Sequence, residues 1–470
     1  MVSLRPMLAT RAPDTDVKSS PPTPGPGPLL HGQPHWTTYL YRLIAGEIST
    51  VTRYSDRVVQ WQPQPFDSGY LLEQVQADAK TTATAIDDVP QGRDDASRAI
   101  VLCNGTFNFS NDIQRLLLDL HPRLARGDRL VSVCYNPYLQ WLYKLANATG
   151  LRRGALPTTF LTRTALDNLA KLSQFEVVRL RPVGFCPFRL LGIGSVVNWL
   201  LAMVPLLRWL ALVSVVVMRP IKPSTKQPSL TIVIPARNEK GNIEAALQRM
   251  PDLGGAALDV IFVEGHSRDG TWEEIQRVLP LYAQKFSVRA FQQTGKGKSD
   301  AVRLGFQHAT GDLLTILDAD LTMPPEQLHR FYDAWCEGKA DFVNGSRLLY
   351  PMEGEAMRFL NRLGNIFFAR AVSAVLDARL GDTLCGTKLV TRIDYQRMIR
   401  WRSDFGDFDP FGDFELLFPA ATLGLGTVDV PIAYRARTYG STNIQRFRHG
   451  FMLLKMTLIG LLRVRAGRWV

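Results

Sequence analysis

The sequence predicts an α/β protein built from two domains, and three observations support this fold class. The chain has 470 residues, of which 46% are hydrophobic and 21% charged, a composition typical of a globular protein with two or three domains. The Pro-containing segment 219–228 is typical of a linker between two regions that each look able to fold. After it, apolar runs alternate with helical patterns, which predicts a mainly parallel sheet with right-handed crossovers.

The charge and cysteine patterns narrow the class of partner. The net charge is +12, and after Glu415 the only acid is Asp429. No nucleic-acid-binding module is recognisable, so the basic excess favours phosphates and an anionic membrane surface as partners and excludes nucleic acid. The five cysteines show neither CxxC pairs nor zinc spacing, which is typical of reduced thiols in a cytoplasmic protein.

The chain is expected to begin with a tail and a first domain. Residues 1–35 are rich in Pro, Ser, Thr and Gly and lack the apolar core of a signal peptide, so a disordered tail is predicted. Residues 36–218 form the predicted first domain, in which 76–97 is expected to be loop. Apolar runs predict its strands, which are expected from Ala99, from Arg129, at 175–182 and at 211–220.

The stretch 190–218 decides whether the first domain crosses a membrane. Its first eighteen residues carry no charge, a length that suits a transmembrane helix. However, Asn198, Pro205 and Arg208 lie inside the stretch, and a β-branched run ends it. A helix to about residue 204, followed by a strand, explains these features better; a single membrane span is the alternative.

The second domain, 229–443, contains five predicted strands separated by helical patterns. The strands are expected at 229–236, 258–265, 287–294, 312–320 and 341–347. Beyond this domain, residues 444–470 mix apolar and basic side chains and contain no uncharged stretch long enough to cross a bilayer. They predict an amphipathic helix that binds anionic lipid, with an ordinary docking helix as the alternative.

Two aspartates follow the fourth strand at the edge where open α/β sheets bind ligands. Leu313–Leu317 predicts a buried strand that ends in Asp318-Ala319-Asp320. Strand alternation directs both aspartates to the same side, and neighbouring carboxylates repel unless a cation or proton lies between them. A hard divalent metal that itself holds a diphosphate is the natural occupant. The alternative is a loop with two solvated aspartates.

Polar segments follow the first two predicted strands, and a basic segment precedes a predicted helix. The first strand ends in PARNE, whose polar groups suit base and ribose, although Asn238 also suits a helix cap. VEGHSRDGT follows the second strand, and its DGT is also typical of a turn and cap. GKGKSD enters a helix, which suits phosphate, with a basic turn as the alternative. The candidates are Pro235, Arg237, Asn238, Glu239, Glu264, Asp269, Lys296 and Lys298.

The remaining motifs combine basic and acidic residues in the last third of the domain. NGSR ends the fifth strand, RLGN follows it, and DTLCGTK, GDFE and RTYGSTN come later. Arginine suits phosphate because its fork binds two oxygens, and carboxylates suit a general base or acceptor positioning. The candidates from these motifs are Ser346, Arg347, Arg362, Lys388, Asp413, Glu415 and Arg437.

Together these ordered motifs make residues 229–450 resemble family-2 glycosyltransferases of the GT-A (Rossmann-like) fold, particularly polyprenyl-phosphate glycosyltransferases. The resemblance implies an inverting transfer from a UDP- or GDP-sugar to polyprenyl phosphate or another membrane-proximal acceptor. It implies that Asp318 and Asp320 hold Mg²⁺ or Mn²⁺ on the donor diphosphate, and that Asp320, Asp413 and Glu415 are the catalytic candidates. The other candidate residues, Asp318 included, would bind substrate.

The sequence departs from the family pattern at three places. Glu264 and Gly265 stand where the family has two acids, which leaves the base of the donor open. Thr322 stands where these enzymes often carry a third polar metal ligand, and Asn443 stands where they have a lysine. A glycolipid or polysaccharide hydroxyl acceptor therefore stays open beside polyprenyl phosphate.

Residues 99–218 resemble the C-terminal half of a class I S-adenosylmethionine methyltransferase, in which 175–182 and 211–220 would be the antiparallel last strands. Such domains bind their cofactor on a glycine-rich loop after the first strand, but 36–98 contains no G-x-G. The interpretation is a degenerate methyltransferase-like domain that binds a partner or braces the transferase. The alternatives are a bifunctional methyltransferase–glycosyltransferase and a non-catalytic scaffold. A cytoplasmic, peripherally membrane-associated protein is expected.

Overall fold

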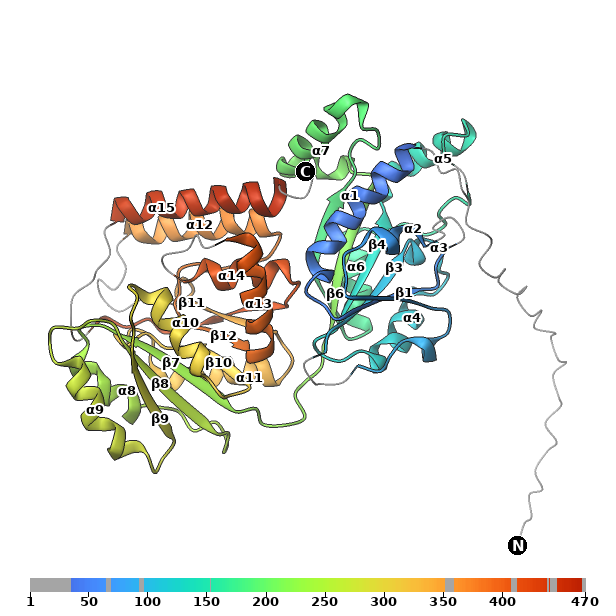
Figure 1. Cartoon of the computed structure of the whole chain (residues 1–470). Coiled ribbons are helices and arrows are strands. Elements are labelled where there is room, and N and C mark those ends of the chain that lie inside the picture. Colours follow the sequence, from blue (N-terminus) through green and yellow to red (C-terminus); the bar gives the residue numbers. More distant parts are fainter. Residues whose placement is uncertain are drawn as a thin grey trace, which may run out of the picture.

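The computed structural model describes residues 35–64, 69–92, 97–152, 154–350, 359–406, 412–437, 439 and 446–466 (Figure 1). The chain forms an α/β protein with two mixed sheets, one on each side of the segment that joins β6 to β7. The predicted tail, 1–35, lies almost wholly outside the described residues, as does Asn443.

The N-terminal domain surrounds a six-stranded sheet of order β2-β1-β3-β4-β6-β5. β1 to β4 pair in parallel, and β6 lies antiparallel between β4 and β5. Its elements are α1 (His35–Thr52), β1 (Arg57–Trp61), α2 (Tyr70–Gln74), β2 (Ala79–Ala83), β3 (Ala99–Asn104), α3 (Thr106–Phe109), α4 (Ile113–Leu120), β4 (Arg129–Tyr135), α5 (Gln140–Ala148), α6 (Arg163–Leu172), β5 (Phe175–Val183), α7 (Ile193–Met203) and β6 (Val213–Pro220).

Most of the predicted secondary structure of this domain is confirmed. Strands begin at Ala99 and Arg129, and 190–218 is a helix followed by a strand, as expected. None of the helices in the described part of the chain is long and apolar enough to span a bilayer. The prediction of loop at 76–97 was wrong, because it contains β2, an edge strand whose largely exposed, Thr-rich residues give no apolar signal.

The C-terminal domain surrounds a seven-stranded sheet of order β13-β11-β12-β10-β7-β8-β9, in which β12 alone runs antiparallel to its neighbours. Its elements are β7 (Leu230–Ala236), α8 (Ile243–Gln248), β8 (Leu258–Glu264), α9 (Thr271–Tyr282), β9 (Ser287–Gln292), α10 (Lys298–His308), β10 (Leu313–Ile316), α11 (Leu328–Cys336), β11 (Phe342–Ser346), α12 (Phe359–Leu376), β12 (Lys388–Thr391), α13 (Arg392–Phe405), α14 (Phe414–Thr422), β13 (Thr427–Pro431), α15 (Arg446–Gly460) and the π-helical turn η8 (Leu461–Ala466).

Strands apolar on both faces explain why this sheet is covered on both sides. Ile232 and Ile234 of β7 belong to the core under α8, α9 and α11, whereas Val233 belongs to the core under α10 and α12 to α15. Such continuous apolar runs are typical of parallel strands buried between helices. The predicted mainly parallel sheet is confirmed, and its carboxyl edge carries the candidate site.

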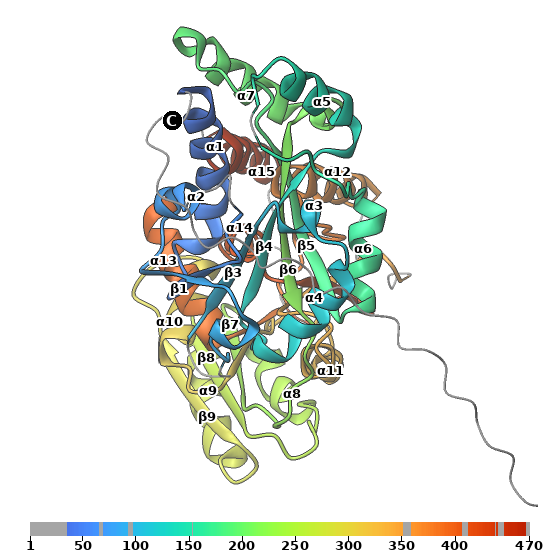
Figure 2. The same ribbon diagram turned by 90° about the vertical axis from the view of Figure 1, so that its right-hand side faces the viewer.

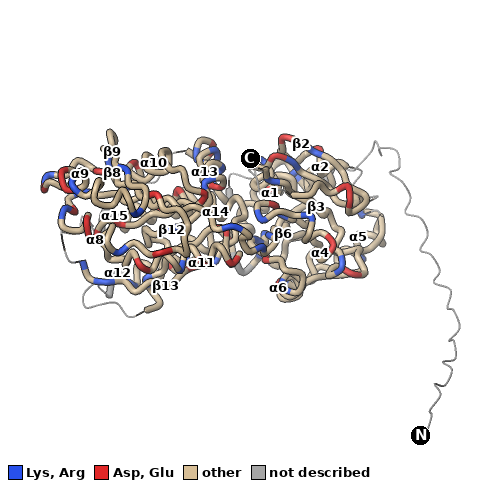
Figure 3. Tube along the Cα trace, turned by 90° about the horizontal axis from the view of Figure 1, so that it is seen from below, with Lys and Arg blue, Asp and Glu red and all other residues tan. Residues whose placement is uncertain are grey.

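Buried arginines of the N-terminal domain join the two domains. Asp341 of the C-terminal domain lies 2.7 Å from Arg129, 3.4 Å from Arg219 and 3.6 Å from Arg126. Figure 3 shows basic and acidic residues gathered where the domains meet. Burial by itself raises the pKa of Asp341, but the three arginines outweigh it and hold that pKa below its usual range.

Two arginines of the N-terminal domain cap the C-terminal end of α14. Arg179 donates to the Thr422 carbonyl at 3.0 Å, and Arg129 donates to the Gly424 carbonyl at 2.6 Å. Arg181 similarly donates to the Leu376 carbonyl at the end of α12, at 3.0 Å. The last carbonyls of a helix have no partner within the helix, and cations are favourable there. The N-terminal domain therefore caps two helices of its neighbour.

Candidate active site

The two aspartates lie just beyond β10, at the carboxyl edge of the sheet. β10 ends at Ile316, so Asp318 and Asp320 belong to the turn that follows and not to the strand itself. Leu321 has a φ of 52°, which reverses the chain directly after them. Thr322 donates its hydroxyl to Asp320 Oδ1 at 2.7 Å, so this threonine fixes the second carboxylate.

A lysine cluster surrounds the first aspartate. Lys298, at the start of α10, forms an ion pair with Asp318. Lys388 of β12 lies 2.7 Å from Asp413. Burial lowers the pKa of Lys298, but Asp318 and Asp413 raise it more, so the lysine stays protonated. Burial raises the pKa of Asp318, but Lys298 and Lys388 outweigh it, and the net pKa lies below its usual range. Lys298 and Asp318 thus form a charged pair, and the Lys388–Asp413 pair lies beside it.

A glycine lets the backbone approach this cluster. A Cβ atom on Gly386 would overlap both the Lys298 ammonium and the Asp318 carboxylate. We therefore expect Gly386→Ala to displace the Lys298–Asp318 pair and to lower kcat/KM by about 10- to 100-fold, as small misplacements in active sites do. Steady-state kinetics check this. Gly364→Ala is the matched control, because a Cβ on Gly364 meets nothing within 4 Å; equal activity of the two variants would contradict the expectation.

An arginine connects the second aspartate to the end of β7. Arg437 lies 2.6 Å from Asp320 Oδ2 and 3.3 Å from Glu239 Oε1. Asn242 donates to the other oxygen of Glu239 at 2.7 Å. Burial raises the pKa of Glu239 more than Arg437 lowers it. The structure thus brings together three residues that the sequence placed in three separate motifs.

The loops after β7 and β8 hold each other by hydrogen bonds. Asn238 has a φ of 56°. Its side-chain oxygen accepts a hydrogen bond from the Arg268 backbone N–H at 2.8 Å, and its own backbone N–H donates to Ser267 Oγ at 2.9 Å. Asp269 accepts from Lys240 N at 3.2 Å. Glu264 is buried and accepts from Ser267 N at 2.5 Å. These contacts shape the loop pair, and Glu264 faces its own loop.

The acceptor-side motifs meet around a buried aspartate. Arg347 binds Asp382 through two parallel contacts of 2.8 and 2.9 Å, a bidentate pair. Its guanidinium carbon lies 5.6 Å from the centre of the Tyr434 ring. Ser346, which precedes Arg347, is buried, and Pro235 is partly exposed. Asp382 thus occupies the fork that the sequence suggested for a phosphate.

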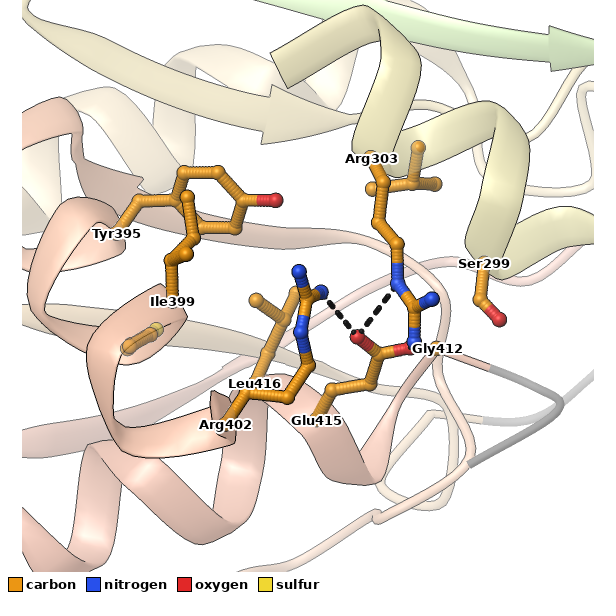
Figure 4. Close-up of a pocket in the computed structure, with 10 residues that line it drawn as sticks. Ser299, Arg303, Tyr395, Ile399, Arg402, Gly412, Glu415 and Leu416 are labelled. Carbon is orange, nitrogen blue, oxygen red and sulfur yellow. Dashed lines mark hydrogen bonds and ion pairs between the residues drawn. The ribbon is translucent and has the colours of Figure 1, made fainter. Parts of the chain in front are cut away.

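Glu415 lies in a separate small pocket lined by residues of α10, α13 and α14 (Figure 4). Arg303 contacts its carboxylate at 2.6 and 2.9 Å, and Arg402 contacts it at 2.8 Å. The pocket has a volume of about 10 Å³, room for at most one water molecule. A sugar does not fit beside Glu415 in this conformation. Neither arginine was a sequence candidate, because each lies in an ordinary helical pattern without a motif.

Three basic candidates lie at the surface. Arg237, Lys296 and Arg362 are exposed, the last on α12. Exposed basic side chains are accessible to a ligand that arrives from solvent or from a membrane. Asp413, in contrast, adjoins the lysine cluster, so of the two acids in the GDFE motif it is the one near Asp318.

The residues present fit a divalent cation held together with a diphosphate. Within the described residues, no group of three or more His, Cys, Asp or Glu is arranged to hold a metal. Mg²⁺ in phosphate-transfer sites usually takes one or two carboxylates and completes its shell with phosphates and water. Asp318 and Asp320 are two such carboxylates, and each is now neutralised by a cationic side chain, Lys298 or Arg437.

Comparison with known proteins matches the C-terminal domain. Residues 231–402 match the family model described as glycosyl transferase family 2. A dolichol-phosphate mannosyltransferase of Pyrococcus furiosus is 33% identical over 240 residues, which are 48% of this chain and 64% of that protein. A dolichyl-phosphate hexose transferase of Haloferax volcanii is 31% identical over 221 residues, 47% of this chain and 89% of that protein.

A solved structure of similar arrangement is a mannosyltransferase from Pyrobaculum calidifontis in complex with GDP-Man and Mn²⁺. It is 18% identical, covers 53% of this chain and 68% of that chain, and has a TM-score of 0.36. At this score the likeness adds no argument of its own. The assignment therefore rests on the family model and on the two sequence relatives.

Proposed function

Because the chain belongs to glycosyltransferase family 2, we propose that it moves a sugar from a UDP- or GDP-sugar to polyprenyl phosphate. It is a hexosyltransferase-like enzyme with a C-terminal GT-A domain and an N-terminal α/β domain of unassigned type. Relatives that use dolichol phosphate, by their names, support the acceptor. The reaction is a single inverting displacement at the anomeric carbon without a covalent enzyme intermediate.

The observation that carries this proposal is the pairing of each turn aspartate with a cation. Lys298 and Arg437 neutralise Asp318 and Asp320. Asp318 and Asp320 would hold Mg²⁺ or Mn²⁺, which would supply charge stabilisation for the leaving nucleotide. Lys298 and Arg437 lie beside these carboxylates, where their cationic groups would favour the departing negative charge. Glu239, Asn238 and the loop of Asp269 border the nucleoside.

The acceptor side of the proposal assigns different roles to the two acids of the GDFE motif. A phosphate acceptor is already anionic and needs little help from a general base. Asp413, next to Lys298 and Lys388, orients sugar hydroxyls. Glu415 of α14 positions α10 and α13 through Arg303 and Arg402 and does not reach the reacting atoms. Arg362 binds the acceptor phosphate, and Arg347 shapes the same pocket through its bidentate pair with Asp382. A glycolipid or polysaccharide hydroxyl acceptor is the alternative.

For the N-terminal domain we propose the role of a brace. The buried contacts of Arg129, Arg179 and Arg219 with the C-terminal domain support this role. The resemblance to methyltransferases stays a prediction: β6 lies antiparallel beside β5, but no glycine-rich loop follows β1. Calorimetry with S-adenosylmethionine tests the bifunctional alternative, which predicts saturable binding.

The test of the proposed function is metal-dependent turnover of a nucleotide-sugar. Purified protein is incubated with a panel of UDP- and GDP-sugars, with and without polyprenyl phosphate, in Mn²⁺ or Mg²⁺. We expect slow hydrolysis of one donor, faster transfer when polyprenyl phosphate is present, and loss of both when EDTA removes the metal. No donor turnover and no metal-dependent nucleotide binding would overturn the proposal.

A further inference from the structure

One edge of the molecule exposes apolar side chains in regular stripes. On α15, Phe451 is 73% exposed, and Leu454 and Leu458 are each at least half exposed. The opposite face of this helix, Leu453 and Met456, is buried. The exposed positions recur at intervals of three and four residues, which places them along one side of the helix. The solvent-facing stripe of α15 is therefore apolar, the reverse of an ordinary surface helix.

The N-terminal domain repeats this pattern on α7. Ile193, Val196 and Leu200 are 64%, 54% and 48% exposed and follow the same three- and four-residue intervals. Leu191, in the turn before α7, is fully exposed at a φ of 55°. A left-handed backbone conformation is strained for leucine, and an exposed side chain buries no apolar surface that would offset this strain. These side chains are placed as though an apolar partner were present.

A third stripe lies on α5 and the turn before it. Tyr138 and Trp141 are each 62% exposed, and Leu145 is 53% exposed. Tyr and Trp are favoured where one end of a side chain is apolar and the other is wet, as at the surface of a bilayer. Tyr138 and Trp141 are thus of the side-chain type that is enriched at the membrane–water interface.

The stripes belong to one continuous edge. α12 packs on α15, α15 continues into η8, η8 contacts α7, and the turn after α7 contacts the turn before α5. Figures 1 and 2 both place α7 at the top of the molecule, with α12 and α15 on the same side in the first view and α5 beside α7 in the second. Both domains therefore contribute to this edge.

The charges of the helices and turns that form this edge are basic. The segments 137–156, 189–209, 359–376 and 446–466 contain no Asp or Glu, although Asp377, directly after α12, pairs with Arg208 at 2.6 Å. The basic side chains that the structure describes in these segments are Lys144, Arg152, Arg189, Arg208, Arg362, Arg370, Lys455 and Arg463. Apolar stripes bordered by Lys and Arg are typical of helices that lie in the interface of an anionic membrane.

We propose that this edge docks on an anionic membrane leaflet and that the N-terminal domain supplies its own part of the contact, through α5, α7 and Leu191. α7 has eleven residues and is about 16 Å long, whereas a bilayer core is about 30 Å thick. The helix therefore lies in the leaflet surface and does not cross it. This inference assigns a membrane contact to the domain of unassigned type and does not require any transferase activity.

The test is vesicle binding of the full chain without donor or metal. Wild-type protein and the double variant Leu191→Glu/Val196→Glu are floated with phosphatidylglycerol–phosphatidylcholine vesicles and with phosphatidylcholine vesicles alone. We expect the wild type to prefer the anionic vesicles and the double variant to bind them at least about tenfold more weakly, since each change removes an apolar contact and adds a repelled charge. Both positions are exposed, so the fold is expected to persist.

Leu172→Glu is the matched control. Leu172, on α6 of the same domain, is 62% exposed, and α6 lies below α5 and α7 in Figure 2. It should bind vesicles like the wild type. A second variant, Trp141→Ser/Leu145→Ser, checks the contribution of α5 even where the first fails to fold. Absent wild-type binding, no preference for anionic vesicles, or unchanged binding of both double variants would overturn the proposal. Light scattering of the wild type and the double variants distinguishes a dimer interface from a membrane contact. If the wild type were a dimer, and the double variants were monomers that bound vesicles like the wild type, the proposal would be overturned.

Discussion

Asp320→Asn is expected to lower kcat/KM for donor turnover by roughly 100- to 1000-fold, because it removes a charge that the proposed metal and leaving diphosphate need. The carboxylate is mostly buried and accepts from Thr322 at 2.7 Å and from Arg437 at 2.6 Å. Asparagine keeps the size of the side chain and one accepting oxygen but loses its charge. Arg437 then faces the nucleotide without its counter-ion. Steady-state rates over a range of Mn²⁺ concentrations measure the effect.

The matched control for Asp320→Asn is Asp333→Asn, the same change at an exposed position on α11. The control should keep wild-type rates and wild-type thermal stability. If Asp320→Asn kept its rate at saturating Mn²⁺, the two-aspartate metal site would be wrong. Partial rescue by high Mn²⁺ would instead support it, because the amide oxygen remains a weak ligand.

Asp341→Ala is expected to cost about 3–5 kcal/mol in the free energy of unfolding, since it leaves buried charges without their partner. Arg126, Arg129 and Arg219 all approach this carboxylate, and Arg129 and Arg219 are almost fully buried. The measurement is thermal and urea unfolding, followed separately for each domain because two domains need not unfold together. Asp119→Ala, which removes an exposed ion pair with Arg115, is expected to cost less than about 1 kcal/mol.

The same residue predicts a pH dependence of stability. The folded-state pKa of Asp341 lies below its usual value, and the unfolded value is about 3.9. The unfolded chain therefore binds its proton first as the pH falls, so the contribution of Asp341 is complete above about pH 5 and is lost in more acidic solution. Wild type and Asp341→Ala should therefore converge in stability under acid. A difference between them that stayed constant from neutral to acidic pH would contradict this account.

The sequence predicted those parts of the fold that local patterns determine. The apolar runs of β3 and β4 and the helix–strand division of 190–218 follow from local composition. So does the place of Asp318 and Asp320 at the carboxyl end of the fourth predicted strand. β12, with only four residues, has too short a pattern to be recognised, and the exposed β2 has none. The reason given for placing the two aspartates together was incomplete, because they lie in a turn where strand alternation no longer applies.

The sequence did not predict which side chains pair with each other across the site. Nothing in the sequence indicates that Arg303 and Arg402 enclose Glu415, since that depends on how α10 packs against α13 and α14. Arg129 and Arg219 are buried, although arginine is usually exposed. Their burial depends on Asp341, which is far away in the sequence. A sequence motif shows which residues lie in the same loop. These contacts depend on which loops and helices pack together in the folded chain, and that is not visible in a motif.

The arginine caps on α12 and α14 also bear on how this gene can change. Arg179 and Arg181 supply the hydrogen bonds that the carbonyls of Thr422 and Leu376 lack within their own helices. A descendant that inherited the C-terminal half without its neighbour would carry two open helix ends and an unneutralised Asp341. Recombination that exchanged the N-terminal half of this chain would therefore have to supply arginines at the same places.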